Sequence, residues 1–164
     1  MKKVTFLLAT LLIGGMMLTG CKKDPQPTPT PTPTPTTKTV EYKMDNTYTQ
    51  DSTTFIISPC FHYKFSYKDA NGTMVEVNDP TLPWSKEITV TAPFEAKLEG
   101  IVTYNEADLP EDRINFEPLV YIKGGGTQVP QNHYVRSFPT KQKFLEYMSQ
   151  HPELMSYSYT LSIN

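Results

Sequence analysis

Apolar and polar residues alternate along three stretches of this chain, and that pattern constrains the fold more than any other feature. Phenylalanine and tyrosine alternate with polar residues over 61–68, and apolar residues do so again over 94–103 and 155–164. Ile101 is the one apolar residue out of step. A period of two puts successive side chains on opposite faces of a strand, so each stretch predicts a half-buried β-strand.

Shorter apolar runs separated by turn residues predict further strands. Asp69-Ala70-Asn71-Gly72 supplies the turn of a hairpin whose second arm is 74–77. The remaining candidates are 40–44, 53–57, 87–91, 119–122 and 133–138. The pattern therefore indicates about eight short strands.

One segment has helical spacing instead. Thr140 can cap a helix that runs through Gln150, with Phe144, Leu145 and Met148 on one face, and Pro152 would end it. Short strands at intervals of about 8–12 residues with turns between them are typical of sandwiches. We predict an all-β fold, an immunoglobulin-like β-sandwich of about eight strands with one short helix before the last strand. A partly open barrel is the structural alternative.

The middle of the chain, 64–99, is similar to the extracytoplasmic β-sandwich of MmpS-like transport-accessory proteins. The residues that carry this likeness are the hairpin 67–72, Leu82-Pro83-Trp84 and Ile88-Thr89-Val90. Those proteins are anchored by a transmembrane helix, and no functional residue carries over. The likeness supports the fold alone.

The first 20 residues have the layout of a secretory signal. Lys2 and Lys3 precede an apolar run that ends at Leu18 and is too short to span a bilayer comfortably. Leu18-Thr19-Gly20-Cys21 resembles the lipobox of bacterial lipoproteins. The resemblance implies cleavage before Cys21 and up to three acyl chains on that residue, which anchor a protein to membrane lipid. The alternative is an ordinary cleaved signal followed by an unrelated cysteine.

Lys22-Lys23-Asp24 follows the lipobox directly. Such a patch resembles the surface-export signal of Bacteroidota-type lipoproteins, which implies an outer-membrane protein displayed on the cell surface rather than on the periplasmic face. The alternative is that these charges only solvate the start of a linker.

A proline- and threonine-rich tract separates this anchor from the rest of the chain. Pro25 to Thr37 contains four consecutive Thr-Pro pairs, which fix an extended backbone of about 3.1 Å per residue, or about 40 Å in all. We therefore divide the chain into a signal peptide (1–20), a lipidated cysteine with its linker (21–37) and a β-sandwich domain (38–164).

Charge and cysteine content narrow the function classes. The whole chain has 15 basic and 17 acidic residues, and loss of Lys2 and Lys3 with the signal leaves a net charge of −4. This lacks the basic surface expected of nucleic-acid binding. If Cys21 is acylated, Cys60 has no partner within the chain, and we expect it to be a buried, unreactive thiol.

Residues with the chemistry of an active site do not cluster in the sequence. His62, His133 and His151 are scattered and fit surface or strand positions better than a metal site. The acidic loop 106–112 lacks a calcium-loop spacing, and Gly124-Gly125-Gly126 lacks the lysine of a phosphate loop, so a solvated loop and a turn are favoured. We predict no catalytic residue, no metal and no cofactor.

Trp84 is the one candidate ligand-binding residue, because exposed indoles recognise sugars and peptides; a core position is the alternative. The favoured function is a non-enzymatic binding or accessory module with a glycan or envelope protein as partner. The alternatives are a structural subunit of a surface assembly that pairs edge strands, and a glycan-processing enzyme.

Changing Cys21→Ser should release the protein from membranes, because the thiol that would carry the lipid is gone. Detergent-phase partitioning and acyl labelling measure this, with Cys60→Ser as the matched control that should stay membrane-bound. Continued acyl labelling of the Cys21→Ser protein would contradict the anchor.

Overall fold

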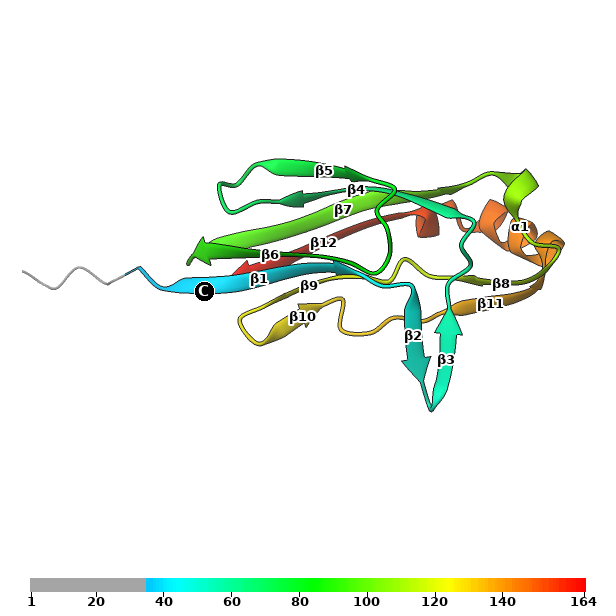
Figure 1. Cartoon of the computed structure of the whole chain (residues 1–164), viewed down its shortest axis with the longest axis horizontal. Coiled ribbons are helices and arrows are strands. Elements are labelled where there is room, and N and C mark those ends of the chain that lie inside the picture. Colours follow the sequence, from blue (N-terminus) through cyan, green and yellow to red (C-terminus); the bar gives the residue numbers. More distant parts are fainter. Residues whose placement is uncertain (1–34) are drawn as a thin grey trace, which may run out of the picture. The chain divides into compact units, whose positions relative to one another are not determined.

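A computed structural model of the chain describes residues 35–164 (Figure 1). Cys21, the signal and most of the proline-rich tract lie outside the described residues. Residues 35–164 form twelve strands, one α-helix and two short 3-10 helices. The strands form two four-stranded sheets and two two-stranded ladders, and all pairings are antiparallel.

The first sheet is built around β1, which pairs with β6 on one side and β9 on the other. The side chains of Val40, Tyr42 and Met44 on β1 point into the interior, and each is at most 1% exposed. In spatial order the strands are β10 (Thr127–Val129), β9 (Val120–Gly124), β1 (Thr37–Met44) and β6 (Trp84–Thr91).

The second sheet contains the three stretches of alternating residues. Phe61, Tyr63, Phe65 and Tyr67 are all buried, whereas their polar neighbours face outward. Ile101, the residue out of step, is 46% exposed on the outer face. In spatial order the strands are β12 (Ser156–Ile163), β7 (Phe94–Tyr104), β4 (Phe61–Lys68) and β5 (Met74–Asn78).

Two small ladders complete the fold. One pairs β8 (Asp112–Phe116) with β11 (Arg136–Thr140), and the other is a hairpin of β2 (Thr47–Gln50) and β3 (Thr53–Ile56). The helix α1 (Lys141–Gln150) follows β11 directly, and the Thr140 hydroxyl caps it by accepting from the Lys143 amide at 3.3 Å. The 3-10 helices are η1 (Glu106–Asp108) and η2 (Pro152–Met155).

Aromatic side chains from both sheets fill the space between the inner faces. Tyr42 and Tyr67 pack with ring centroids 5.1 Å apart, and the Tyr42 hydroxyl donates to the Lys68 carbonyl at 2.6 Å, which links the sheets directly. Burial raises the pKa of Tyr42 to about 12. At the end of the core beside α1, Phe144 is fully buried against the rings of Phe61, Tyr104, Phe116 and Phe138.

The predicted class, a β-sandwich with one short helix before the last strand, is confirmed. The number of strands is larger than the predicted eight or so. β2 and β10 carry no clear alternation over their three or four residues, and β8 alternates only from Ile114 to Phe116. Met155, expected to begin the last strand, instead ends η2.

Replacing Phe144→Ala should lower the free energy of unfolding by about 3–5 kcal/mol, because it leaves a cavity among packed rings. Chemical denaturation followed by tryptophan fluorescence measures the change. Lys143→Ala, on the exposed side of the same helix turn, removes only a surface ion pair to Glu146 and should cost about 0.5 kcal/mol or less. Equal effects of the two changes would contradict this packing.

Candidate functional site

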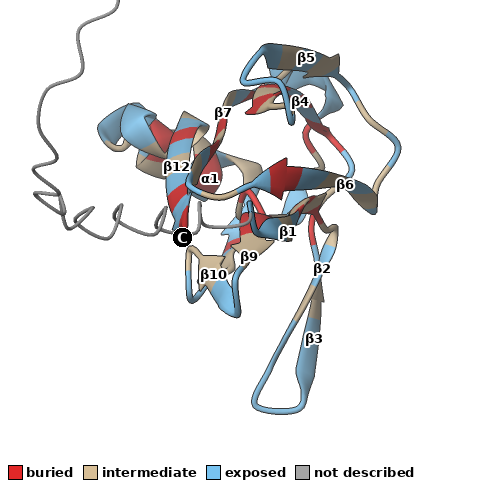
Figure 2. Ribbon diagram, turned by 90° about the vertical axis from the view of Figure 1, so that its left-hand side faces the viewer, coloured by how far each residue is buried: buried red, intermediate tan, exposed pale blue. Residues whose placement is uncertain are grey.

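The β2–β3 hairpin projects from the sandwich and pairs with neither large sheet (Figures 1 and 2). Its turn residues Asp51 and Ser52 have φ angles of 48° and 67°, the left-handed values that match the twist of a two-residue hairpin. Most of its side chains are exposed, and Ile56 is 62% exposed. The hairpin therefore presents a surface rather than filling the core.

Asn115 on β8 holds the base of this hairpin. Its Nδ2 donates to the Ile56 carbonyl at 2.9 Å, and its Oδ1 accepts from the Ser137 hydroxyl at 2.7 Å. The backbone amide of Asn115 also donates to the Ser58 hydroxyl at 3.0 Å, and its carbonyl accepts from the Ser58 amide. These bonds fix the hairpin against the β8–β11 ladder.

A second contact on the hairpin involves His133. The ring of Tyr48 meets the His133 ring edge-on with centroids 6.4 Å apart, and Tyr121 packs on it at 6.1 Å. The Nδ1 atom of His133 lies 3.6 Å from the Glu117 carboxylate, which also pairs with Arg136 at 2.6 Å. This cluster places the hairpin strand β2 over the loop that leads into β11.

The expectation that all three histidines occupy surface or strand positions is wrong for His133. It lies in the loop before β11 and is only 5% exposed, because tyrosine rings from β2 and β9 cover it. His62 is exposed on β4, and His151 follows α1 with its ring 4.3 Å from that of Tyr147. The three rings do not share a site.

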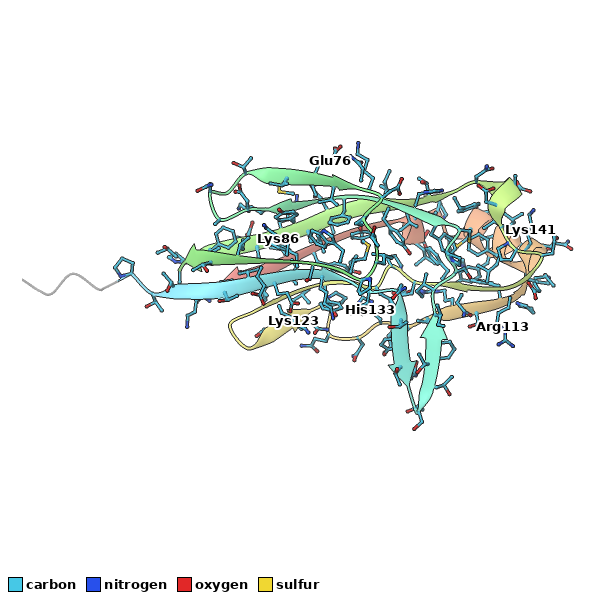
Figure 3. The ribbon with its side chains drawn as sticks, in the orientation of Figure 1. Glu76, Lys86, Arg113, Lys123, His133 and Lys141 are labelled. Atoms are coloured by element: carbon cyan, nitrogen blue, oxygen red, sulfur yellow. The ribbon has the colours of Figure 1, made fainter. Side chains whose placement is uncertain are left out.

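A groove of about 420 Å³ lies between strand β3 and the outer face of the β8–β11 ladder. Its volume falls within the range of about 300–1,000 Å³ that holds small ligands. Figure 3 shows Arg113 projecting from the ladder on the same side as the hairpin. The groove is lined by Thr53, Thr54, Phe55, Arg113, Asn115, Ser137, Phe138 and Pro139.

The side chains that line this groove are suited to binding a ligand rather than to catalysis. Hydroxyl, amide and guanidinium groups line it beside two phenylalanines and a proline, and none of its lining residues is a histidine, cysteine or carboxylate. Such a lining can hydrogen-bond and stack on a ligand, but it offers no general base or activated nucleophile.

A second hollow is an open depression of about 520 Å³ on the outer face of the β12-β7-β4-β5 sheet. Glu76 and Glu99 both line it, and each pairs with a lysine, at 3.1 Å to Lys64 and 2.6 Å to Lys97. Hydrogen bonds from Asn78 and Lys64 hold the pKa of Glu76 below its usual value. A glycosidase acid needs a raised pKa, so Glu76 fits a solvated surface better.

Trp84 lies away from the groove, at the start of β6. Its ring is half-buried and packs against Phe65 and Tyr67 with centroid distances of 4.9 and 5.8 Å. This packing accounts for the indole as part of the core margin. Cys21 lies outside the described residues.

The other residues considered from the sequence take structural positions. Cys60 is buried, and burial raises the pKa of its thiol. Gly125 and Gly126 form the turn between β9 and β10 with positive φ angles of 57° and 80°. Within residues 35–164, no three His, Cys, Asp or Glu side chains stand close enough together to hold a metal ion.

Sequence reasoning missed Arg113 and Asn115 because it did not predict β8. Ser137 falls within the predicted strand 133–138, but nothing in the local sequence showed that it faces Asn115. The signal that was present is the turn Asp51-Ser52 between two threonine-rich arms, which is a hairpin pattern. The groove itself depends on a contact between segments 59 residues apart, which no local pattern shows.

No protein-family model matches the chain, and a search of curated proteins returned no match. In the part of the chain that the structure describes, no helix has the length and apolar character needed to cross a bilayer.

Replacing Asn115→Ala should loosen the hairpin, because the Ile56 carbonyl and the Ser137 hydroxyl both lose their partner. Hydrogen exchange should show protection of the β2–β3 amides reduced by about 1–2 kcal/mol, with β4 and β7 unchanged. Asn78→Ala, which removes only an exposed bond to Glu76, is the control. Unchanged hairpin protection would refute the role of Asn115.

Proposed function

We propose that this protein is a lipid-anchored cell-envelope protein whose β-sandwich is a non-enzymatic binding module. In this proposal acylated Cys21 holds it in the outer membrane, on the cell surface, and the partner is a glycan or an envelope protein. The observation that carries the proposal is the groove between β3 and the β8–β11 ladder, with a polar wall held in place by Asn115.

The position of the groove supports presentation away from the anchor. β1 begins at Thr37, at one end of the sandwich, and the β8–β11 ladder lies toward the opposite end (Figure 1). A ligand in the groove would therefore be met toward the end of the domain opposite the start of β1 (Figure 1).

Binding is favoured over catalysis by the residue types at the hollows. The groove lining has no group that transfers protons near neutral pH, and the acidic pair of the open depression is neutralised by lysines. Enzymes instead shift the pKa values of their acids and bases toward the working pH. A binding site needs only shape and hydrogen-bonding groups.

Assembly through an edge strand is the second candidate function, and one observation favours it. β12 pairs only with β7 among the described strands, is eight residues long and carries no charge, whereas the edge strand β6 exposes Lys86 opposite buried Tyr42 (Figure 3). Uncharged edges permit strand addition. However, Ile163 packs over Gly124 of β9, where even a Cβ would approach it to 2.6 Å, so one end of β12 is covered.

Two experiments test this proposal, each with the full-length protein and its Ser137→Trp variant. A glycan array probed with the detergent-solubilised lipoprotein detects sugar ligands, and a cross-linking screen on intact cells detects protein partners. The indole should block the groove and weaken binding at least about tenfold, or 1.4 kcal/mol. Ser85→Trp, at an exposed serine on β6 that lines neither hollow, is the control and should bind as the unmodified protein does.

Retained binding by the Ser137→Trp protein would place the site elsewhere, and failure to capture any glycan or envelope protein would contradict the module. Light scattering of the same sample separates the two functions, since a binding module stays monomeric and an assembly subunit forms oligomers.

A further inference from the structure

The charge at the groove comes from a single arginine. The sequence has two arginines, and Arg136 is paired with Glu117 at 2.6 Å. Arg113 is exposed, lines the groove and makes no ion pair with any residue of 35–164. No acidic side chain lines the groove with it. A guanidinium left free in a concave site favours an anionic ligand group, above all a carboxylate, which it can hold through two parallel hydrogen bonds.

The wall beside Arg113 presents hydroxyl groups in fixed positions. Ser137 donates its proton to Asn115 at 2.7 Å, so its oxygen remains free to accept from a ligand. Thr54 lies 3.1 Å from Thr49 across the hairpin, hydroxyl to hydroxyl, and Thr53 lies beside it. Asn115 uses one amide hydrogen on the Ile56 carbonyl and one oxygen lone pair on the Ser137 hydroxyl, so its second amide hydrogen can still donate to a ligand beside the hydroxyls and the guanidinium.

The apolar part of the lining includes one accessible aromatic ring. Phe55 and Pro139 line the groove beside these polar groups, whereas the ring of Phe138 is turned inward against Phe144 and Tyr147. Sugar rings present an apolar C–H face and a rim of hydroxyls, so they match an aromatic surface flanked by hydrogen-bonding side chains. A peptide bound through its backbone would use an unpaired strand edge, whereas the polar groups that line this groove are side-chain hydroxyls, an amide and a guanidinium.

We propose that the groove binds an acidic saccharide, with the carboxylate of a uronic-acid type residue on Arg113 and its ring hydroxyls on Ser137 and the threonines of β3. This inference rests on the proposed binding function and names its ligand class. The net charge of −4 for the mature chain works against anion binding overall, so the affinity must depend on Arg113 itself.

Calorimetry of the full-length protein in detergent with trigalacturonate tests the proposal, and its fully methyl-esterified form is the matched ligand without charge. Binding to the acid should exceed binding to the ester at least about tenfold, and Arg113→Gln should abolish that difference. Lys86→Gln removes the same charge from β6 and should leave the affinity within about twofold. Arg113→Lys should recover only part of it, because an ammonium cannot form the paired bonds.

Equal binding of acid and ester, or an Arg113→Gln protein that still prefers the acid, would overturn the inference. So would binding of triglutamate in place of trigalacturonate, which would make the ligand an acidic peptide. In each of these cases loss of binding in the Ser137→Trp protein would still support the proposed function. If neither Arg113→Gln nor Ser137→Trp changes the binding of any ligand, the proposed function is overturned as well.

Discussion

The packing of the two inner sheet faces against each other is the interaction on which the remainder of this structure depends. Tyr42 and Tyr67 meet across the interface, Trp84 closes its margin on Phe65, and Phe144 fills its end beside α1. Burial of aromatic area is worth about 25 cal/mol per Å², and well-oriented ring pairs add about 0.5–1.5 kcal/mol each. Without this core, neither the hairpin nor the β8–β11 ladder would have a support.

The candidate site lies on the β2–β3 hairpin and on the outer face of the β8–β11 ladder, which the core supports from beneath. β8 and β11 send Ile114, Phe116 and Phe138 inward, which leaves Arg113, Asn115 and Ser137 on the outer face. The hairpin then forms the opposite wall, held at its base by the bond from the Asn115 amide to the Ile56 carbonyl. A rigid support beneath exposed polar groups limits the entropy lost when a ligand binds, which is the arrangement expected of a recognition site.

Local pattern was a good guide to the strands that face the core and a poor one elsewhere. The buried residues of β4, β7 and β12 and the cap of α1 were predicted correctly because burial on one face imposes a period of two on a strand, while Thr140 has a specific capping role. β2 and β10 were missed because they are short and contribute no fully buried side chain. β8 was missed because its alternation covers only Ile114, Asn115 and Phe116, too short a stretch to recognise. The burial of His133 was missed because its covering rings belong to other segments.

Alternation of side chains was therefore enough to establish an all-β fold with one late helix, since each strand records its own burial in its residue order. The groove could be decided only by the folded chain. Asn115 and Ile56 are 59 residues apart in the sequence. Arg113 is a candidate ligand-binding residue only because the fold places the threonines of β3 across the groove from it and no carboxylate among residues 35–164 pairs with it. Hydrogen bonds and ion pairs form between groups a few ångströms apart in space, and the local sequence around one partner does not show which distant residue is the other.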